Sequence, residues 1–448
     1  MKNYGRMHTN TNLYNCKMEK MKNCMSVIKK HILILLMGSI LGLLALVVVH
    51  LLPTQQMREN VRWSIDMIEK EFSDEVMIDG YNATLTGNFT DCLMLEHAIY
   101  SHENHSVLEQ VLHMYRSETY YDENYEDGWW PGQSLKDYLG NVPQPREVTY
   151  GRYWHGYLVI IKPLLWLTTF NTIRLFNAAL QLILAGFVAI ELCKRGADSL
   201  AKAFMVSLPF MFFVSSFASL SLSICLYIML VSVLVQLRCK EWLKAQGRYE
   251  IFFFVIGMAT SYFDFLTYPL VTLAYPLCVF LYFNEDNTRK HLKSLIVCSI
   301  EWFVGYGGMW ALKWTLSDLL TNSNIIKDAF FTVFIRTQSA ENATRFEGFF
   351  GVVAKNVQVY LNWGYLLLFI AIALYFLVKI LQKGIKGVVL KMPTECCFFL
   401  LACYPFAWYF VMQNHSEQHW QFTCRIMSIT IFAGITGIIR IIEKIDNS

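Results

Sequence analysis

Two histidines and an arginine lie close together in NHSEQHWQFTCR, residues 414–425, between two strongly apolar runs near the end of the chain. His415 and His419 are four residues apart, so on a helix they would share one face and could bind a metal ion or a phosphate group. The planar guanidinium of Arg425 donates two hydrogen bonds at once, which suits a phosphate. These residues predict a polar binding site at one edge of an apolar protein.

The same residues also fit structural roles. Two histidines in a loop outside the membrane are often polar residues at the rim of a protein, and an arginine at a helix end extends its charged group into the interface. A divalent metal is therefore an open expectation, and no other cofactor is indicated.

Asp91 is the candidate catalytic base. It lies in NATLTGNFTDCLMLEHAIYS (82–101), which predicts a polar turn followed by a helix that starts near Thr90. A carboxylate in the first turn of a helix is also stabilised by the positive end of the helix dipole. Its position leaves both the catalytic and the structural role open.

Three further cations are candidates for binding an anionic substrate. Arg174 stands at the outer end of a predicted helix, and Arg152 and Lys162 lie nearby in the sequence. Asp264 is an ionisable residue in an apolar hairpin, which makes it a functional candidate unless the hairpin turns there and exposes it to water.

Aromatic residues gather just ahead of these cations, and Trp154 is the candidate among them for substrate binding. Such residues are typical of the belt at a membrane interface, and they also suit stacking against sugar rings. The group consists of Trp129, Trp130, Tyr150, Tyr153 and Trp154.

The elements that must position these residues are membrane helices. The 448 residues are 55% hydrophobic and 16% charged, and several apolar runs approach the roughly 20 residues that a helix needs to cross a bilayer. One of them is ILILLMGSILGLLALVVVHLL (32–52). The sequence predicts an all-α polytopic membrane protein.

Charge predicts the orientation of the chain. Residues 1–31 carry seven Lys and Arg, which favours the cytoplasm, and residues 53–152 carry 18 Asp and Glu against 7 Lys and Arg, which suits an external domain. The run at 153–170 contains Lys162 and Pro163 and predicts a juxtamembrane helix on the outer face.

About ten transmembrane helices follow from this pattern, in a multi-pass protein of the cell membrane with both termini cytoplasmic. Two pairs of helices would turn near SSFAS (215–219) and near SYFDFLTYP (261–269). The predicted organisation is a basic cytoplasmic tail (1–31), a first transmembrane helix (32–52), an extracytoplasmic domain (53–172) with the juxtamembrane helix 153–170, a transmembrane helix bundle (173–442) and a cytoplasmic tail (443–448).

The external domain is expected to combine helices with irregular structure. Ser106 and Glu109 have the spacing of a capping box and predict the start of a second helix. The following stretch is dense in aromatic residues, Gly and Pro, which indicates a folded but irregular loop. Cys92 and Cys424 both lie on the predicted outer side, where a disulfide between them could form.

The order of these features resembles the GT-C superfamily of membrane glycosyltransferases, especially the branch of protein O-mannosyltransferases and lipid A aminoarabinose transferases. In that branch one crossing precedes a large outer loop whose acidic residue begins a helix. TDCLMLEHAIYS (90–101) is similar to this acidic start, IKPLLWLTTF (161–170) to the family's Lys-Pro segment, and NTIRLFNAALQLILAG (171–186) to its arginine-led crossing. The 414–425 stretch also resembles a motif in uncharacterised polytopic proteins of Gram-positive bacteria.

The resemblance implies transfer of a sugar from a polyprenyl-phosphate donor to a glycan or lipid acceptor of the cell envelope, in a membrane-lipid environment. The acceptor hydroxyl is a weak nucleophile, so a carboxylate, here Asp91, would take its proton while cations stabilise the departing phosphate. Arg425 is the first candidate for that cation.

Two other function classes remain open on the sequence. A transporter or flippase of lipid-linked glycans would carry charged residues deep in its crossings, and here the ionisable groups crowd the outer rim. A non-catalytic envelope-assembly protein would also fit. No Walker loop, dinucleotide-binding motif or nucleic-acid-binding pattern stands out, so no nucleic-acid partner is expected.

Overall fold

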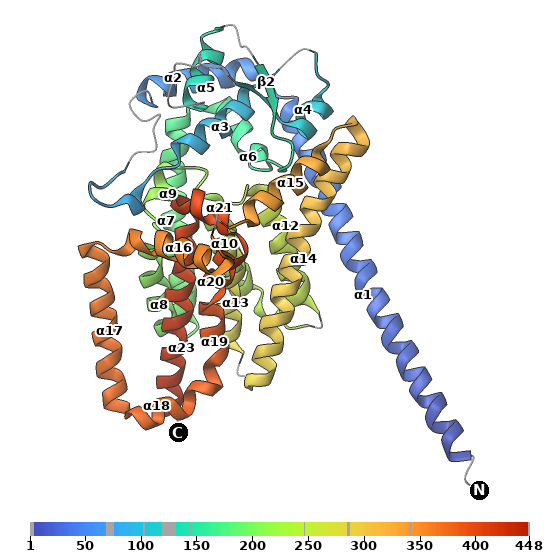
Figure 1. Cartoon of the computed structure of the whole chain (residues 1–448), viewed down its shortest axis with the longest axis vertical. Coiled ribbons are helices and arrows are strands. Elements are labelled where there is room, and N and C mark those ends of the chain that lie inside the picture. Colours follow the sequence, from blue (N-terminus) through green and yellow to red (C-terminus); the bar gives the residue numbers. More distant parts are fainter. Residues whose placement is uncertain are drawn as a thin grey trace.

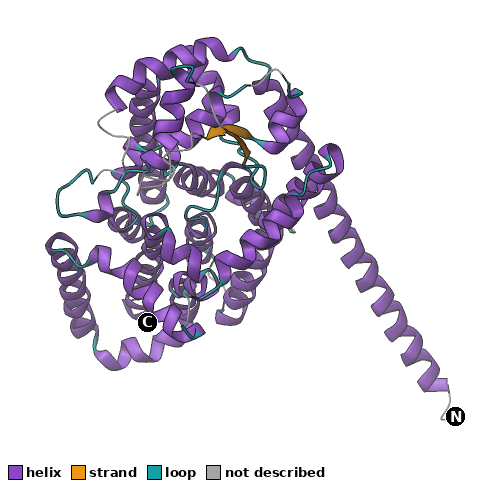
Figure 2. Cartoon of the chain, turned by 45° about the horizontal axis from the view of Figure 1, so that its top comes forward, coloured by secondary structure: helices purple, strands orange, loops and turns teal. Residues whose placement is uncertain are grey.

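Helices dominate the computed structural model, and one small two-stranded sheet accompanies them in the described chain (Figure 2). The fold class predicted from the sequence, all-α, is thus confirmed at this level. The structure describes residues 4–68, 76–101, 104–118, 131–142, 146–245, 247–284, 287–339 and 343–446. Trp129 and Trp130 lie outside the described residues.

Five segments of the described chain are helical, long and apolar enough to cross a membrane. They are Met25–His50 in α1 (Tyr4–His50), α7 (Phe170–Lys194), α14 (Thr288–Thr321), α17 (Trp363–Lys383) and Trp420–Asp446, which contains α22 (Trp420–Thr423), η4 (Cys424–Met427) and α23 (Ser428–Asp446). Large apolar side chains are exposed along them, among them Leu41, Phe176 and Leu367. These properties are compatible with a membrane location.

Other apolar helices are shorter than the roughly 20 residues of a full crossing. They are α8 (Asp198–Phe210), α10 (Ile224–Arg238), α12 (Arg248–Phe263), α13 (Leu270–Phe283), α19 (Cys396–Ala402) and α20 (Tyr404–Val411). The short α9 (Ser215–Ala218) lies between α8 and α10, and α12 ends just before Asp264. Both turns therefore fall where the sequence predicts them.

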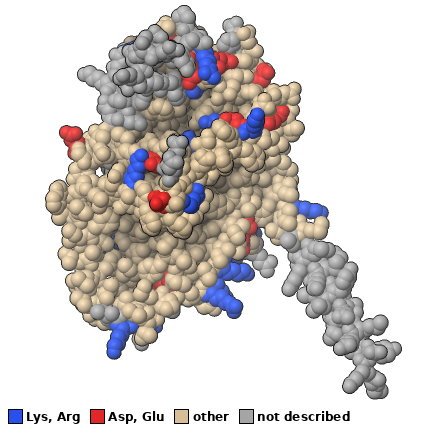
Figure 3. All heavy atoms as spheres, in the orientation of Figure 1, with Lys and Arg blue, Asp and Glu red and all other residues tan. Residues whose placement is uncertain are grey.

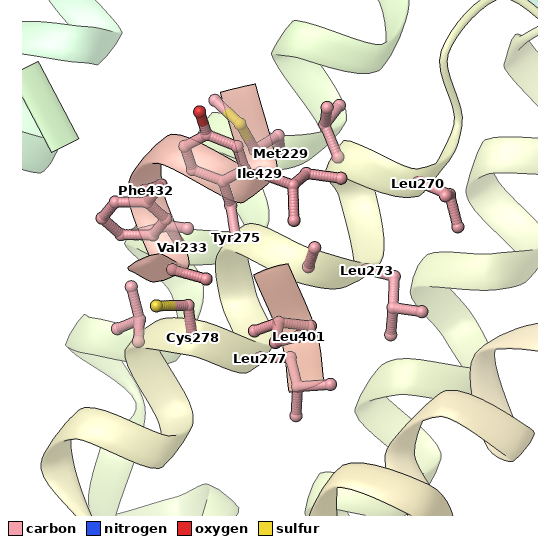
Figure 4. Packing of buried hydrophobic residues seen from close by; sticks show 14 of the residues in the cluster. Met229, Val233, Leu270, Leu273, Tyr275, Leu277, Cys278, Leu401, Ile429 and Phe432 are labelled. Atoms are coloured by element: carbon pink, nitrogen blue, oxygen red, sulfur yellow. The ribbon is translucent and has the colours of Figure 1, made fainter. Parts of the chain in front are cut away.

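The main core forms where α10, α13, α19 and α23 meet (Figure 4). Tyr275 of α13 stacks on Phe432 of α23 with ring centroids 4.6 Å apart and an interplanar angle of 13°. Met229 of α10 and Leu401 of α19 belong to the same buried cluster. Segments more than 200 residues apart in sequence thus share one core.

A pair of glycines allows α12 and α14 to touch backbone to backbone. A Cβ atom at Gly257 would lie 2.1 Å from the carbonyl oxygen of Trp302, and one at Gly305 would lie 2.1 Å from that of Phe254. Small residues at a helix crossing allow this close approach in membrane bundles. The crossing fixes the turn after α12, which contributes to the site described below.

The described parts of the chain between residues 54 and 167 form a cap at one end of the bundle (Figure 1). The N-terminal end of α1 and the C-terminal end of the chain lie at the other end of the molecule. The elements of the cap are α2 (Thr54–Ile68), η1 (Asn82–Thr84), α3 (Asn88–Ile99), α4 (Val107–His113), β1 (Tyr115–Glu118), α5 (Pro131–Leu139), β2 (Arg146–Thr149) and α6 (Leu158–Leu167).

Within the cap, the helix expected near Thr90 begins at Asn88, and the capping box of Ser106 and Glu109 is formed at the start of α4. The two strands pair antiparallel, with Arg116 opposite Val148. The strands and α5 were not expected, because four paired residues and one short helix leave too little periodicity in the sequence.

Further short elements connect the bundle helices. They are α11 (Lys240–Leu243), α15 (Ile325–Thr337), α16 (Arg345–Val357), η2 (Gln358–Tyr360), α18 (Ile385–Lys391), η3 (Met392–Glu395) and α21 (Gln413–Gln418). Most charged side chains on the face drawn in Figure 3 lie over the cap and the junction beneath it, or at the opposite end. The surface between them is largely uncharged.

Candidate functional site

A cavity of about 270 Å³ lies between the cap and the adjoining ends of the bundle helices. Its walls come from α3 and the segment before α6 on the cap side, and from the α12–α13 turn, α15, α21 and α22 on the bundle side. Its ionisable side chains are those of four histidines, three tyrosines and an arginine: His97, His155, His415, His419, Tyr150, Tyr153, Tyr157 and Arg336.

On the cap side, hydrogen bonds assign the tautomers of two histidines. His155 Nε2–H donates to the carbonyl oxygen of Tyr150 at 2.9 Å, because a carbonyl only accepts. The other nitrogen of His155, Nδ1, then accepts from the Tyr157 hydroxyl at 3.0 Å. The Tyr157 oxygen in turn accepts from His97 Nδ1–H at 3.2 Å, which leaves a lone pair on His97 Nε2.

Burial keeps these two rings neutral. It lowers the pKa of His155 to about 3 and that of His97 well below its ordinary value, with the neighbouring cations adding to the effect. The rings lie 4.7 Å apart, and the Tyr150 ring stacks on His97 at 5.9 Å. The chain of hydrogen bonds from Tyr150 to His97 is therefore a stable feature of the cap-side wall at neutral pH.

The bundle-side histidines are assigned in the same way. His415 Nε2–H donates to the carbonyl oxygen of Leu266 at 2.9 Å, so its Nδ1 carries a lone pair. His419 Nε2 accepts a hydrogen bond from Nη1 of Arg336 at 2.5 Å, so its Nδ1 carries the proton. Burial and the charge of Arg336 lower the pKa of His419 to about 4.

The turn after α12 brings the Leu266 carbonyl to His415. Leu266 has a positive φ of 71°, and the Asp264 carboxylate accepts hydrogen bonds from the backbone N–H groups of Leu266 and Thr267 at 2.9 and 3.0 Å. Asp264 is only 2% exposed, so it holds the turn rather than meeting water. Its position in the apolar hairpin is explained by these hydrogen bonds.

Arg336 supplies positive charge to the cavity wall. Its Nη1 contacts His419 and the amide oxygen of Gln418, and no acidic residue within the described ranges forms a salt bridge with it. Arg152 differs, because its Nη1 pairs with Asp328 at 3.0 Å. An arginine with unused donors beside a cavity is suited to bind an anion.

Of the predicted binding residues, His415 and His419 line the cavity, with ring centroids 5.0 Å apart. Both rings thus face the same cavity, although His419 follows the last residue of α21 rather than lying within it. Arg152 lines a smaller cavity next to it, together with Tyr153 and Arg336, and its guanidinium lies 4.7 Å from the Tyr150 ring centroid.

Arg425, the first candidate for the phosphate-binding cation, is buried away from the cavity. Its Nη2 donates to the Ser215 hydroxyl at 2.7 Å, and its guanidinium carbon lies 5.5 Å from the Phe212 ring centroid. These contacts attach the start of the last long helix to the α8–α9 turn. The arginine therefore neither lines the cavity nor extends into an interface.

Asp91 lies in the first turn of α3, as predicted, and is also absent from the cavity wall. Its carboxylate accepts hydrogen bonds from the backbone N–H groups of Leu220 and Ser221 at 2.9 and 2.8 Å. Burial raises its pKa to about 6, against the opposing effects of these hydrogen bonds and the charge of Arg174. Asp91, Arg174 and Arg425 thus do not meet in this cavity.

Lys162 and Trp154 lie in the interior and join elements to each other. The ammonium of Lys162 donates to the carbonyl oxygen of Ala98 at 2.6 Å, in the last turn of α3. The indole N–H of Trp154 donates to the carbonyl oxygen of Met309 in α14 at 2.8 Å, and its side chain is fully buried. Trp154 is therefore neither a belt residue nor a wall of the cavity.

The sequence leaves a divalent metal site open. Among the described residues no group of three or more His, Cys, Asp or Glu side chains is arranged to hold a metal ion. Cys92 and Cys424 are both buried and neither forms a disulfide, so the bond expected between them as an option is not present.

Three important residues of the cavity were missed by reasoning from the sequence: His97, His155 and Arg336. Each is an ionisable residue in a segment expected on the outer side, which is the signal that could have indicated them. They come from α3, from the segment before α6 and from α15, and α3 and α15 are more than 200 residues apart in sequence, so only the tertiary fold brings them to one cavity. Comparison with protein-family models, curated proteins and solved structures finds no significant match to this chain.

Proposed function

We propose that this protein is a membrane glycosyltransferase of the GT-C type, which moves a sugar from a polyprenyl-phosphate donor to a cell-envelope acceptor. The observation that carries the proposal is the cavity at the cap–bundle junction, with Arg336 in its wall and no acidic partner for it among the described residues. In this proposal the donor phosphate binds to Arg336 and to Nδ1–H of His419.

The topology proposed with it has ten crossings. The five long helices would each cross once. The shorter α8, α10, α12, α13 and the α19–α20 pair would supply five further crossings where the bilayer thins locally around them. Both termini would be cytoplasmic in the cell membrane, and the cap would face outward. The basic N-terminal tail and the placement of both chain ends opposite the cap support this orientation.

The proposed reaction is attack of an acceptor hydroxyl on the sugar carbon that carries the phosphate. The new carbon–oxygen bond forms as the bond to the phosphate oxygen breaks, the polyprenyl phosphate leaves with the bonding electrons, and a base takes the hydroxyl proton. Arg336 would stabilise the charge on the leaving phosphate. The assignment of Asp91 as the base stays a prediction, because its carboxylate is engaged by two backbone N–H groups.

Lipid binding by the purified protein tests this proposal. The wild type in detergent is expected to bind a short-chain polyprenyl phosphate at least about tenfold more tightly than the corresponding alcohol, which is about 1.4 kcal/mol. Arg336→Gln should lose this preference. Lys327→Gln, which removes an exposed cation from the same helix α15 without touching the cavity, should keep it.

Equal binding of the phosphate and the alcohol by the wild type would reject the proposal. A second measurement then compares the envelope glycans of cells that carry the wild type, a deletion and Arg336→Gln. The deletion and Arg336→Gln should lose the same sugar. Retention of all sugars by the deletion strain would reject a role in glycan transfer.

A further inference from the structure

Two nitrogen atoms in the cavity histidines have unused hydrogen-bonding capacity. His97 Nε2 and His415 Nδ1 are buried and have no hydrogen-bond partner among the described residues. The two side chains are only 2% and 3% exposed, and both line the cavity. They come from opposite walls, His97 from α3 and His415 from α21.

The hydrogen bonds of these rings determine what the unused nitrogens can bind. Because His97 donates through Nδ1 to Tyr157 and His415 donates through Nε2 to Leu266, each remaining nitrogen carries a lone pair and only accepts. An unpaired acceptor in a buried site costs about 1–3 kcal/mol. A ligand that donates hydrogen bonds would recover this energy at both positions.

We infer that His97 Nε2 and His415 Nδ1 form a sugar-binding subsite that accepts hydrogen bonds from two hydroxyl groups of a neutral sugar ring. This inference rests on the proposed function and specifies its substrate class. A hydroxyl group donates to such nitrogens, whereas a carboxylate has no proton to donate at neutral pH and would place its charge against two lone pairs. The subsite therefore selects a neutral sugar over a uronic acid.

The surrounding wall fits the same ligand. The aromatic side chains of Tyr150, Tyr153, Phe265 and Phe422 line the cavity beside the histidines and supply apolar surface for the C–H groups of a sugar ring. Arg336 and His419 place hydrogen-bond donors next to His415, whose ring centroid lies 5.0 Å from that of His419. The cavity thus has a region of donors for a phosphate beside a region of acceptors for hydroxyl groups.

Three lipids with the same short polyprenyl chain test the subsite: the phosphate alone, the phosphate linked to a neutral hexose, and the phosphate linked to a hexuronic acid. The wild type should bind the hexose compound about tenfold or more tightly than the phosphate alone, and the uronic acid compound no more tightly than the phosphate. His97→Phe and His415→Phe should lose the gain from the hexose but keep the affinity for the phosphate. His113→Phe, a cap histidine outside the cavity, should behave as the wild type.

The outcomes separate the subsite from the proposed function. If no phosphate lipid is preferred over its alcohol, the proposed function fails, and the subsite is then judged with a free methyl hexoside, whose binding should shift the ¹⁵N resonance of His97 Nε2. If phosphate binds but the hexose gives no gain, or the gain survives both Phe variants, the subsite is rejected.

A tautomer measurement on the wild type supports the test independently of the two histidine variants. In ¹⁵N-histidine NMR of the wild type, His97 should show a protonated Nδ1 and an unprotonated Nε2. Tyr157→Phe removes the hydroxyl that accepts from His97. The His97 ring should then no longer be held with its proton on Nδ1, and the discrimination against the uronic acid should decrease at least several-fold. A protonated Nε2 in the wild type would overturn the inference.

Discussion

The carboxylate of Asp91 accepts a hydrogen bond from the backbone N–H of Ser221 at 2.8 Å, and so attaches α3 of the cap to the turn before α10. The neighbouring N–H of Leu220 donates to its other oxygen at 2.9 Å. One acidic side chain thereby satisfies two buried backbone donors of a turn that has little regular structure. The residue that the sequence marks as a catalytic candidate is, in this structure, a connection between the two halves of the molecule.

Asp91→Asn is predicted to destabilise the protein. The amide has one acceptor oxygen and turns its NH₂ group toward a buried backbone donor, which leaves one donor unpaired at a cost of about 1–3 kcal/mol. Thermal unfolding in detergent should show a clear decrease in midpoint. Asp79→Asn, an exposed acid of the cap, serves as the control and should have almost no effect. An Asp91→Asn variant that is fully stable but lacks glycan transfer would instead support a catalytic role.

A second connection between cap and bundle depends on Lys313 of α14. Its ammonium donates to the carbonyl oxygens of Val111 and Leu112 at 3.1 and 2.9 Å, in the last turns of α4. Lys313→Met keeps the apolar volume but removes these bonds, and is expected to cost about 1–3 kcal/mol. Hydrogen exchange should accelerate in α4 first. Lys327→Met should leave α4 protected, and equal exchange in both variants would show that Lys313 does not hold this helix.

Much of the fold was predictable because its determinants are local. Pro53 comes shortly after the end of α1 at His50, the capping box of Ser106 and Glu109 begins α4, and small polar residues mark the break at 215–219. Helix α16 was not expected, although Thr344 and Glu347 form a capping box ahead of an apolar run. The spacing of Thr344 and Glu347 is the local signal that could have indicated this helix.

The site was predictable only in part, for a physical reason. His415 and His419 belong to one short segment, so their spacing shows that they share a face. The partners of these residues, Arg336 and the Leu266 carbonyl, come from other elements and are brought in by tertiary packing. The same holds for Asp91, whose place in a helix is local information and whose hydrogen-bond partners are not.

The crossing of α12 and α14 gives a prediction about packing. Gly257→Ala places a Cβ 2.1 Å from the Trp302 carbonyl oxygen, so the two helices must separate, and a destabilisation of about 1–3 kcal/mol or more is expected. Gly307→Ala on α14 is the matched control, because its Cβ meets no atom within 4 Å. It should be neutral or stabilising by up to about 1 kcal/mol, since Ala favours helix over Gly. Equal unfolding temperatures for the two variants would contradict the close crossing.

The cavity histidines predict a dependence of stability on pH. Burial and the charge of Arg336 lower the pKa of His419 from 6.5 to about 4. Between about pH 6.5 and pH 4, His419 is protonated in the unfolded chain but not in the folded chain. Protonation therefore favours the unfolded chain, and the folded protein loses stability as the pH falls through this interval. Each such histidine contributes a slope of up to about 1.4 kcal/mol per pH unit. Unfolding midpoints in detergent should decrease steadily from pH 7 to pH 5.

His419→Gln tests this assignment, because the glutamine oxygen can still accept from Arg336 but does not titrate. The variant should have a shallower pH dependence than the wild type over the same interval. His105→Gln, a substitution in the cap outside the cavity, should leave the slope contributed by His419 in place. If His419→Gln and the wild type lose stability in parallel on acidification, His419 is protonated as readily in the folded protein as in the unfolded chain, and the contact with Arg336 does not hold it neutral.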